Sequence, residues 1–228
     1  MTNKEIQKPS WFLYATEAIR AIIEWLRALF FMAFYQYPNL GKGRPVLVVP
    51  GFLGSDWSTG MLRKFLQKLG FTAYGWGLGQ NLGDLQDIDR LVQKVANIQT
   101  QHQQKVILIG WSLGGIYVRE IAKRRPENVA QVFTLGSPFA APDAPNHAVW
   151  IFNLFNDFGK IDPHFREQVP SPAPVRTTAL YSYQDGIVPW EACRELQEDE
   201  LRQNILVKSS HIGFVRNAQV FQVLVERL

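Results

Sequence analysis

The feature that most constrains this chain is an apolar segment that runs into a turn rich in glycine and then into a helical pattern. Residues 106–109, Val-Ile-Leu-Ile, predict a fully buried strand. Residues 110–114, Gly-Trp-Ser-Leu-Gly, follow at once, and apolar residues then recur at helical spacing until Pro126. Because so short a turn strains its central residue, Ser112 is predicted to project its hydroxyl above the end of a sheet.

Further apolar segments alternate with helical patterns along the rest of the chain. The predicted strands are residues 46–49, 71–74, 106–109, 129–135, 177–183 and 204–208. This alternation predicts an α/β fold with a doubly wound, mostly parallel sheet of about six strands. With 228 residues, 46% of them hydrophobic, the chain can bury one good core. We expect residues 1–40 to form an N-terminal helical extension and residues 41–228 to form the sheet domain.

Residues 11–37 form a long amphipathic helical pattern. One face carries the charged residues Glu17, Arg20, Glu24 and Arg27, and the other carries Ile19, Ile22, Ile23, Leu26, Leu29 and Phe30. Two interpretations stay open. The helix packs on the domain or on a second subunit, or it lies in a membrane interface with its aromatic rings at headgroup depth. Its charges argue against a helix that spans a membrane.

The composition limits the cellular compartment and the partners that we expect for this protein. The net charge of +4 is small and the basic residues are scattered, so no nucleic-acid partner is expected. A single cysteine, Cys193, excludes an internal disulfide, and no secretory signal is apparent. We therefore expect a cytoplasmic protein, at most peripheral to the inner membrane. The glycine run over residues 75–83 lacks the spacing of a dinucleotide or phosphate loop, so no cofactor is expected there.

The unit around Ser112 resembles the nucleophile elbow of the α/β-hydrolase superfamily. A glycine-rich connection in some other α/β sheet is the alternative explanation. The resemblance covers roughly residues 44–228. The predicted sheet is similar to the reduced, six-stranded form of small bacterial lipases. It implies that Ser112 is a nucleophile and that an acid and a histidine follow it in that order, each past a strand end.

Two residues fit the roles of base and acid. Of the four histidines, only His211 directly follows a predicted strand and precedes the final helix. Asp185 lies in residues 183–189, Tyr-Gln-Asp-Gly-Ile-Val-Pro, which resembles the acid turn of many α/β-hydrolases, although Asp-Gly is also a common turn pair. Asp143 is the second candidate for the acid. The resemblance also implies an oxyanion hole formed by the backbone N–H groups of Phe52 and Leu113.

These residues predict a small serine hydrolase of the lipase/esterase type that needs no metal or cofactor. The expected substrate is a small-molecule ester or a lipid. The insertion at about residues 140–176, rich in proline and aromatic residues, is expected to be a helical cap over an apolar acyl pocket, with plain core packing as the alternative. An acyltransferase or thioesterase with the same triad, and a binding protein that has lost catalysis, remain the alternative functions.

Overall fold

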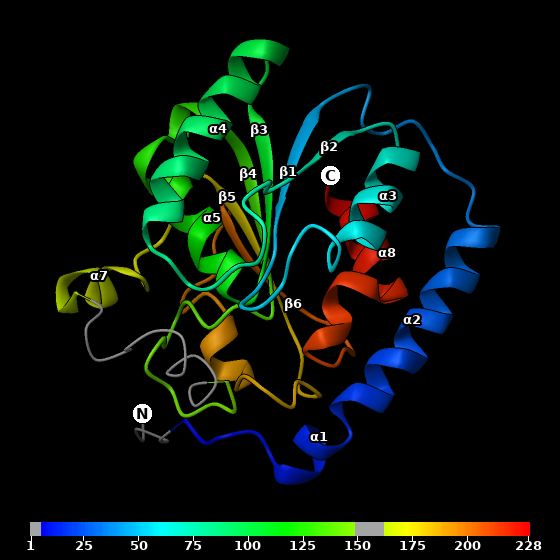
Figure 1. Cartoon of the computed structure of the whole chain (residues 1–228), viewed down its shortest axis with the longest axis vertical. Coiled ribbons are helices and arrows are strands. Elements are labelled where there is room, and N and C mark those ends of the chain that lie inside the picture. The colour runs from blue at the N-terminus through cyan, green and yellow to red at the C-terminus, as the bar shows by residue number, and fades with distance from the viewer. Residues whose placement is uncertain (1–5, 149–161) are drawn as a thin grey trace.

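A single six-stranded sheet forms the centre of the molecule in the computed structural model, which describes residues 6–148 and 162–228 (Figure 1). All of its neighbouring strands are parallel, in the order β2-β1-β3-β4-β5-β6. The strands are β1 (Pro45–Val49), β2 (Thr72–Gly75), β3 (Val106–Trp111), β4 (Val129–Leu135), β5 (Arg176–Tyr181) and β6 (Arg202–Leu206). The predicted fold class is confirmed, with strand ends within two residues of those expected.

Helices cover both faces of the sheet, as the buried strands require (Figure 1). On one face lie α4 (Gln86–His102) and α5 (Leu113–Arg124). On the other lie α3 (Gly60–Lys68), η4 (Ile212–Arg216) and α8 (Ala218–Arg227), with α2 (Glu17–Phe34) packed outside them. The remaining short helices are α1 (Trp11–Ala15), η1 (Pro126–Asn128), α7 (Pro163–Gln168) and η3 (Trp190–Cys193).

The register of the sheet brings the ends of four strands to one edge. Trp111, the last residue of β3, pairs with Leu135 at the end of β4, and Leu135 pairs with Leu180 of β5. Tyr181 in turn pairs with Leu206, the last residue of β6. Since parallel strands all point the same way, the loops that follow β3, β5 and β6 meet at this edge. Those loops carry Ser112, Asp185 and His211.

The last helix is shorter than the pattern predicts. A single helix from residue 214 to 228 is expected, but the chain forms η4 and then begins α8 at Ala218. Asn217 separates the two, and its side chain accepts hydrogen bonds from the N–H groups of Gln219 and Val220. This is an N-cap, which starts a new helix instead of continuing the old one.

The expected cap is described only in part. Its residues Trp150, Phe152, Phe155 and Phe158 lie outside the described residues. The described part includes α7, whose Asp162 cap accepts a hydrogen bond from the N–H of His164. Phe165 of α7 packs against buried hydrophobic residues of the sheet domain.

The N-terminal helix packs on the domain, which is part of one of the two interpretations left open, but its apolar face does not make this contact. Residues 11–34 form α1 and α2, which meet at Thr16, and α2 turns inward the side that carries Glu17 and Glu24. The buried positions of α2 are Glu17, Ala21 and Ala28, while the expected packing residues Ile19, Ile22, Ile23, Leu26, Leu29 and Phe30 are exposed. The reason is that partners for Glu17 and Glu24 lie under the helix. Within residues 6–148 and 162–228, no helix is both long enough and apolar enough to cross a membrane.

Candidate active site

The turn between β3 and α5 holds Ser112 in a backbone conformation that residues with a side chain rarely adopt. Its φ is 53° and its ψ is −122°. The N–H of Ser112 donates to the carbonyl of Leu135 on the neighbouring strand at 2.9 Å, which ties the turn to the sheet. Gly114 permits the tight geometry, because a Cβ there would lie 2.4 Å from the carbonyl oxygen of Val49. The predicted strand–turn–helix unit therefore presents Ser112 at the carboxyl edge of the sheet.

The structure brings Ser112, His211 and Asp185 into one hydrogen-bonded line. His211 Nε2 lies 2.9 Å from Ser112 Oγ, and His211 Nδ1 lies 2.6 Å from Asp185 Oδ2. The other carboxylate oxygen of Asp185 accepts from the N–H groups of Ile187 and Val188, each at 2.8 Å. Because Asp185 accepts the Nδ1 proton, Nε2 is left as the acceptor for the serine hydroxyl.

The competing candidates lie elsewhere. Asp143 is exposed and pairs with Arg166, and His164 bonds Gln168 on α7. His102, expected to be solvated, is half-buried, with its Nε2 2.7 Å from the Tyr74 hydroxyl. His147 is buried and stacks on Tyr14, with its Nε2 3.0 Å from the carbonyl oxygen of Pro9. Cys193 is also buried, and burial raises the pKa of its thiol well above the usual value.

The loop after β1 carries Phe52 and approaches Ser112 closely. A Cβ on Gly51 would lie 2.9 Å from the Cβ of Ser112. The glycine-rich loop after β2 holds this segment in place through Asn81, which is fully buried. Its side-chain amide donates to the carbonyl of Pro50 at 2.9 Å, and its backbone bonds Leu53 and Gly54 at 2.7 and 2.8 Å. The glycine run therefore buttresses the loop that carries Phe52.

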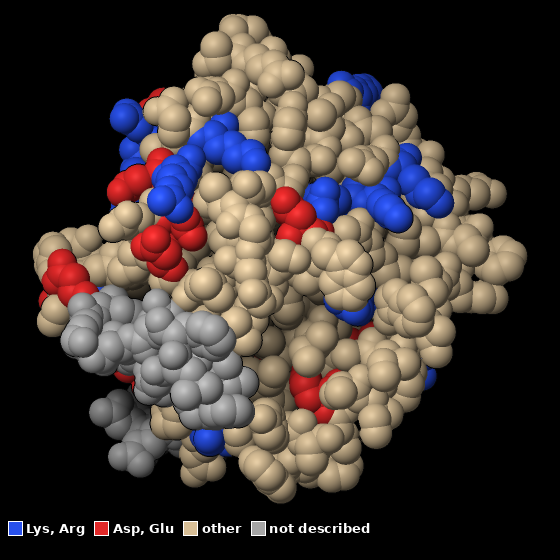
Figure 2. All heavy atoms as spheres, viewed as in Figure 1, with Lys and Arg blue, Asp and Glu red and all other residues tan. Residues whose placement is uncertain are grey.

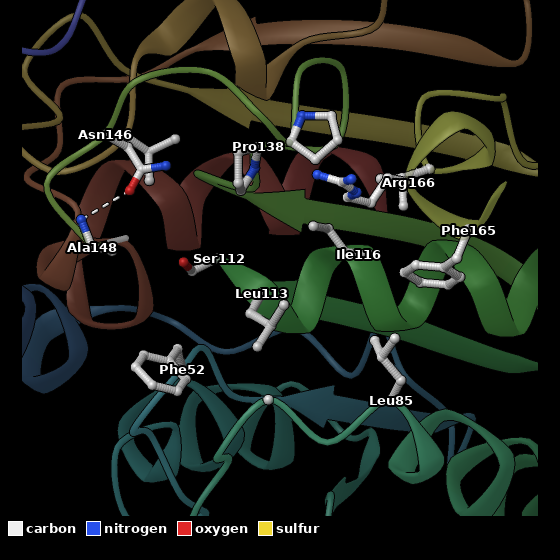
Figure 3. Close-up of a pocket in the computed structure, with 14 residues that line it drawn as sticks. Phe52, Leu85, Ser112, Leu113, Ile116, Pro138, Asn146, Ala148, Phe165 and Arg166 are labelled. Atoms are coloured by element: carbon white, nitrogen blue, oxygen red, sulfur yellow. Dashed lines mark hydrogen bonds between the residues drawn. The ribbon is translucent and has the colours of Figure 1, made fainter. Parts of the chain in front are cut away.

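A pocket opens beside Ser112 (Figure 3). The Ser112 hydroxyl points into it, with Phe52 and Leu113 on one side of the hydroxyl and Pro138 and Asn146 on the other. The remaining lining residues are mostly apolar and include Leu85, Ile116, Phe165, Val169 and Val188. The described part of the insertion therefore contributes to the pocket through α7 and through the loop around Asn146. An apolar lining with few polar groups suits the acyl part of a substrate.

Glu17 of α2 connects two loops. One is the loop after β5 that carries Asp185, here called the acid loop, and the other is the loop after β6 that carries His211, here called the base loop. Its side chain is buried, and Oε1 accepts from the N–H of Ile212, next to His211, at 2.9 Å. Oε2 accepts from the N–H of Gly186, next to Asp185, at 3.1 Å and pairs with Arg20 at 2.8 Å. Burial raises the pKa of the Glu17 carboxyl, and the hydrogen bond from Ile212 opposes that change.

Glu24, two turns further along α2, holds the start of the same base loop. Its carboxylate accepts from the N–H of Ser210 at 2.8 Å, from the Ser210 hydroxyl at 3.0 Å and from the Ser209 hydroxyl at 3.2 Å. Gly213 makes this approach possible, because a Cβ there would lie 1.6 Å from the Glu24 carboxylate. Two carboxylates of one helix therefore bind the backbone on either side of His211.

The charges around His211 set its protonation. Burial lowers the pKa of the His211 imidazole, but the charge of Asp185, the hydrogen bond to Asp185 and the charge of Glu17 all raise it. The net result is a pKa above the usual 6.5. The imidazole is therefore protonated up to a higher pH than a free histidine.

The interpretation from sequence missed the roles of Glu17, Glu24 and Asn81. One signal was present. The two glutamates are seven residues apart, and with Ala21 and Ala28 they form a stripe of small and acidic residues on one helix face. Because carboxylates are mostly exposed in proteins, such a stripe does not by itself indicate a buried face. The sequence held no comparable signal for Asn81, because its partners are backbone groups brought near by the fold.

Comparison with known proteins places this chain in a family. The model of the alpha/beta hydrolase family matches residues 46–213, more than half of the chain. The chain therefore belongs to the alpha/beta hydrolase family. No curated protein matches it in sequence.

Solved structures with the same fold include several described as lipases. A Bacillus licheniformis lipase is 19% identical with a TM-score of 0.63, over 84% of this chain and 94% of that one. A monoacylglycerol lipase of Paleococcus ferrophilus is 17% identical with a TM-score of 0.59, over 81% and 95%. A lipase-esterase related protein from Clostridium acetobutylicum is 18% identical with a TM-score of 0.60, over 84% and 97%. At these identities the likeness is one of fold.

Proposed function

We propose that this protein is a serine hydrolase that cleaves carboxylic esters through Ser112, His211 and Asp185. One observation carries the proposal: the unbroken hydrogen-bonded line from the serine hydroxyl through the imidazole to the carboxylate. This arrangement activates an alcohol for attack on an acyl carbon, and it does so on several unrelated folds. Membership of the alpha/beta hydrolase family supports the proposal.

The first half of the proposed reaction forms an acyl-enzyme. Ser112 Oγ attacks the ester carbonyl carbon while His211 Nε2 takes the hydroxyl proton, and Asp185 stabilises the imidazolium. The negative charge on the carbonyl oxygen is held by the N–H groups of Leu113 and Phe52, both of which line the pocket with Ser112. When the tetrahedral intermediate collapses, the bond to the alcohol oxygen breaks and His211 gives that oxygen its proton.

The second half releases the acid. A water molecule takes the place of the alcohol and passes a proton to His211 Nε2 as it attacks the acyl carbon. The bond to Ser112 Oγ then breaks, and the proton returns from His211 to the serine. The products are a carboxylic acid and the free enzyme, so the cycle needs no further reactant.

The substrate class follows from the pocket. Apolar side chains line it beside the serine, so we infer that the acyl part of the substrate is apolar, as in acyl esters or lipids. The names of the structural neighbours, among them lipases, are consistent with this inference. An acyltransferase or thioesterase with the same residues is the alternative, since it differs only in the group that enters or leaves.

The test is the variant Ser112→Ala with p-nitrophenyl esters of increasing acyl length. We expect turnover to fall by about a thousandfold or more, because the nucleophile is lost. We expect the circular dichroism spectrum and the melting temperature to stay close to those of the wild type. The matched control is Ser171→Ala, since Ser171 is exposed and is not among the residues that line the pocket.

Covalent labelling completes the test. A fluorophosphonate should attach to Ser112 in the wild type and fail to attach in Ser112→Ala. Full turnover in Ser112→Ala would contradict the proposal, and absence of labelling in the folded wild type would favour a protein that only binds ligands. Product analysis with an added alcohol acceptor or with a thioester substrate distinguishes the acyltransferase and thioesterase alternatives from an ester hydrolase.

A further inference from the structure

The outer face of α1 and α2 is an exposed apolar surface, here called the N-terminal apolar face. Its exposed residues are Trp11, Phe12, Ile19, Ile22, Ile23, Trp25, Leu26, Leu29, Phe30 and Phe34, together with Trp57 in the loop before α3. Phe30 is 69% exposed and Trp57 is 84% exposed. The edge of the molecule that α2 forms in Figure 1 is mostly free of charged groups in Figure 2. A contiguous apolar area of this kind marks an interaction surface.

The charges around this face are cationic. Among residues 6–38 the exposed charged side chains are Lys8 and Arg27, because Glu17 and Glu24 are turned inward. Lys64 and Lys68 of α3 are also exposed, and they share one recess with Trp25 and Trp57. Figure 2 shows Lys and Arg gathered over α3. Asp56 also lines the recess, where its carboxylate accepts from the N–H groups of Trp76 and Gly77.

We propose that the N-terminal apolar face docks on an anionic lipid surface. Tryptophan and phenylalanine with adjacent lysine and arginine are the residues with which a helix lies in a membrane interface. A second copy of this chain fits less well. In a symmetric dimer this face would meet itself, so the cations Arg27, Lys64 and Lys68 would approach the same cations with no exposed acid of α1, α2 or α3 to pair with them.

The face reaches the rim of the pocket beside Ser112. Trp11 and Tyr14 of α1 contact the ring of His147 at 5.8 and 4.3 Å between ring centres. The neighbours of His147 in sequence, Asn146 and Ala148, line the pocket. A lipid surface held by α1 and α2 would therefore lie next to the pocket entrance.

The test is sedimentation with vesicles of phosphatidylcholine alone or of phosphatidylcholine mixed with phosphatidylglycerol. We expect the wild type to bind the mixed vesicles more tightly, and Phe30→Glu to weaken binding by about tenfold or more. Lys64→Glu with Lys68→Glu should weaken binding by about fivefold per cation. The matched controls are Leu196→Glu, at a leucine that is 75% exposed, and Lys105→Glu, at an exposed lysine outside this face. Both should bind as the wild type does.

Three results would overturn the docking proposal. The first is a wild type that binds neither vesicle. The second is equal loss of binding in Phe30→Glu and Leu196→Glu, which would mean that the face has no special role. The third is a dimer in light scattering that Phe30→Glu dissociates while vesicle binding stays absent, which would assign the face to a second copy. None of these results depends on turnover.

The inner face of α2 supports a second inference, which does not depend on lipid docking but rests on the proposed function. We propose that Glu17 is a positioning residue that fixes the distance between the acid loop and the base loop. Its carboxylate binds the N–H of Gly186 and the N–H of Ile212, which follow Asp185 and His211 directly in the chain. The carboxylate of Asp185 also joins the two loops, through His211 and through the N–H groups of Ile187 and Val188, so Glu17 is a second carboxylate that holds them together. A small shift of either loop would lengthen the 2.6 Å contact between imidazole and Asp185.

The charged groups around His211 come from the acid loop and from α2. Asp185 lies on the acid loop, and Glu17 lies on α2 with its partner Arg20. Glu24, also on α2, binds Ser210, the residue before His211. The charge of Glu17 is one of the causes that raise the pKa of His211. Removal of that charge should therefore lower the pKa of His211. Since the base must be neutral, the fall of kcat/KM in acid should then move to lower pH.

The test compares Glu17→Gln with Lys105→Gln, which removes a charge from an exposed side chain outside α2 and outside the pocket. We expect Glu17→Gln to lower kcat by about tenfold to a hundredfold with little change in KM. We also expect the acid limb of kcat/KM, and the pKa of His211 measured by NMR, to move to lower pH. Lys105→Gln should leave kcat, KM and the acid limb of a soluble ester unchanged.

The outcomes separate this inference from the proposed function. If the wild type turns over no ester, the proposed function fails, and the NMR pKa still tests the contact between Glu17 and the base loop. If the wild type is active and Glu17→Gln keeps both kcat and the acid limb, the positioning role is wrong. If Glu17→Gln has a lower melting temperature but the same acid limb of kcat/KM as the wild type, Glu17 has a structural role alone.

Discussion

At the scale of single residues, local strain and buried polar groups concentrate where the chemistry is proposed. Ser112 adopts a positive φ, and it is held there by a hydrogen bond to Leu135 and by the absence of a side chain at Gly114. Asn81 is a second example, because its amide is fully buried and all its partners lie in two loops. A buried amide that fixes backbone segments contributes to geometry more than to hydrophobic stability.

The variant Asn81→Ala should separate the contribution of Asn81 to the geometry of the Phe52 loop from its contribution to stability. The variant removes the donor to Pro50 and leaves the loop that carries Phe52 less restrained, so we expect kcat to fall by about tenfold or more. The free energy of unfolding should fall by about 1–3 kcal/mol, because buried backbone groups lose their partners. Ester turnover and urea unfolding measure the two effects. Asn97→Ala, at an exposed amide on α4, is the control and should change neither.

At the scale of elements, α5 is tied to the loop before β6 by a buried ion pair between Arg119 and Glu195. The Arg119 guanidinium also donates to the carbonyl of Ser171 at 3.1 Å and stacks 3.8 Å from the centre of the Phe139 ring. Burial lowers the pKa of Arg119, and the charge of Glu195 opposes that change. The pair thus joins α5, the helix that follows Ser112, to the loop that leads into the edge strand β6.

Glu195→Ala should destabilise the protein strongly, because Arg119 would stay buried without its counter-ion. We expect the free energy of unfolding to fall by about 3–5 kcal/mol, measured by urea denaturation. The double variant Arg119→Met with Glu195→Leu should recover most of that loss, since it removes both buried charges. Glu127→Ala, in the exposed pair with Arg125, is the control. A Glu195→Ala variant as stable as this control would show that water reaches the pair.

At the scale of the whole molecule, the parallel sheet and the N-terminal helices meet at the active-site edge. The sheet aligns the loops after β3, β5 and β6, and α2 binds two of those loops from outside through Glu17 and Glu24. The chain before β1 lies outside the family match at residues 46–213, yet it contacts both Gly186 and Ile212. The expected cytoplasmic location and the division at residue 41 stay predictions.

The sequence by itself determined the parts of this protein that depend on local order. The predicted strand at 106–109 and the serine between Gly110 and Gly114 predict an elbow, because periodicity and small residues act within a few positions. The alternation of strands and helices likewise predicts the parallel sheet. His211 stands out because it directly follows a predicted strand, and Asp185 because its turn resembles the acid turn of many α/β-hydrolases.

Only the tertiary structure shows which side chains of distant segments meet. Asp143 and Asp185 both follow strands, and the register of β4, β5 and β6 puts Asp185 beside His211. The same holds for α2, whose pattern shows two faces but not which of them is inside. Its carboxylates point inward because the N–H groups of Gly186, Ser210 and Ile212 lie beneath the helix and need hydrogen-bond partners there.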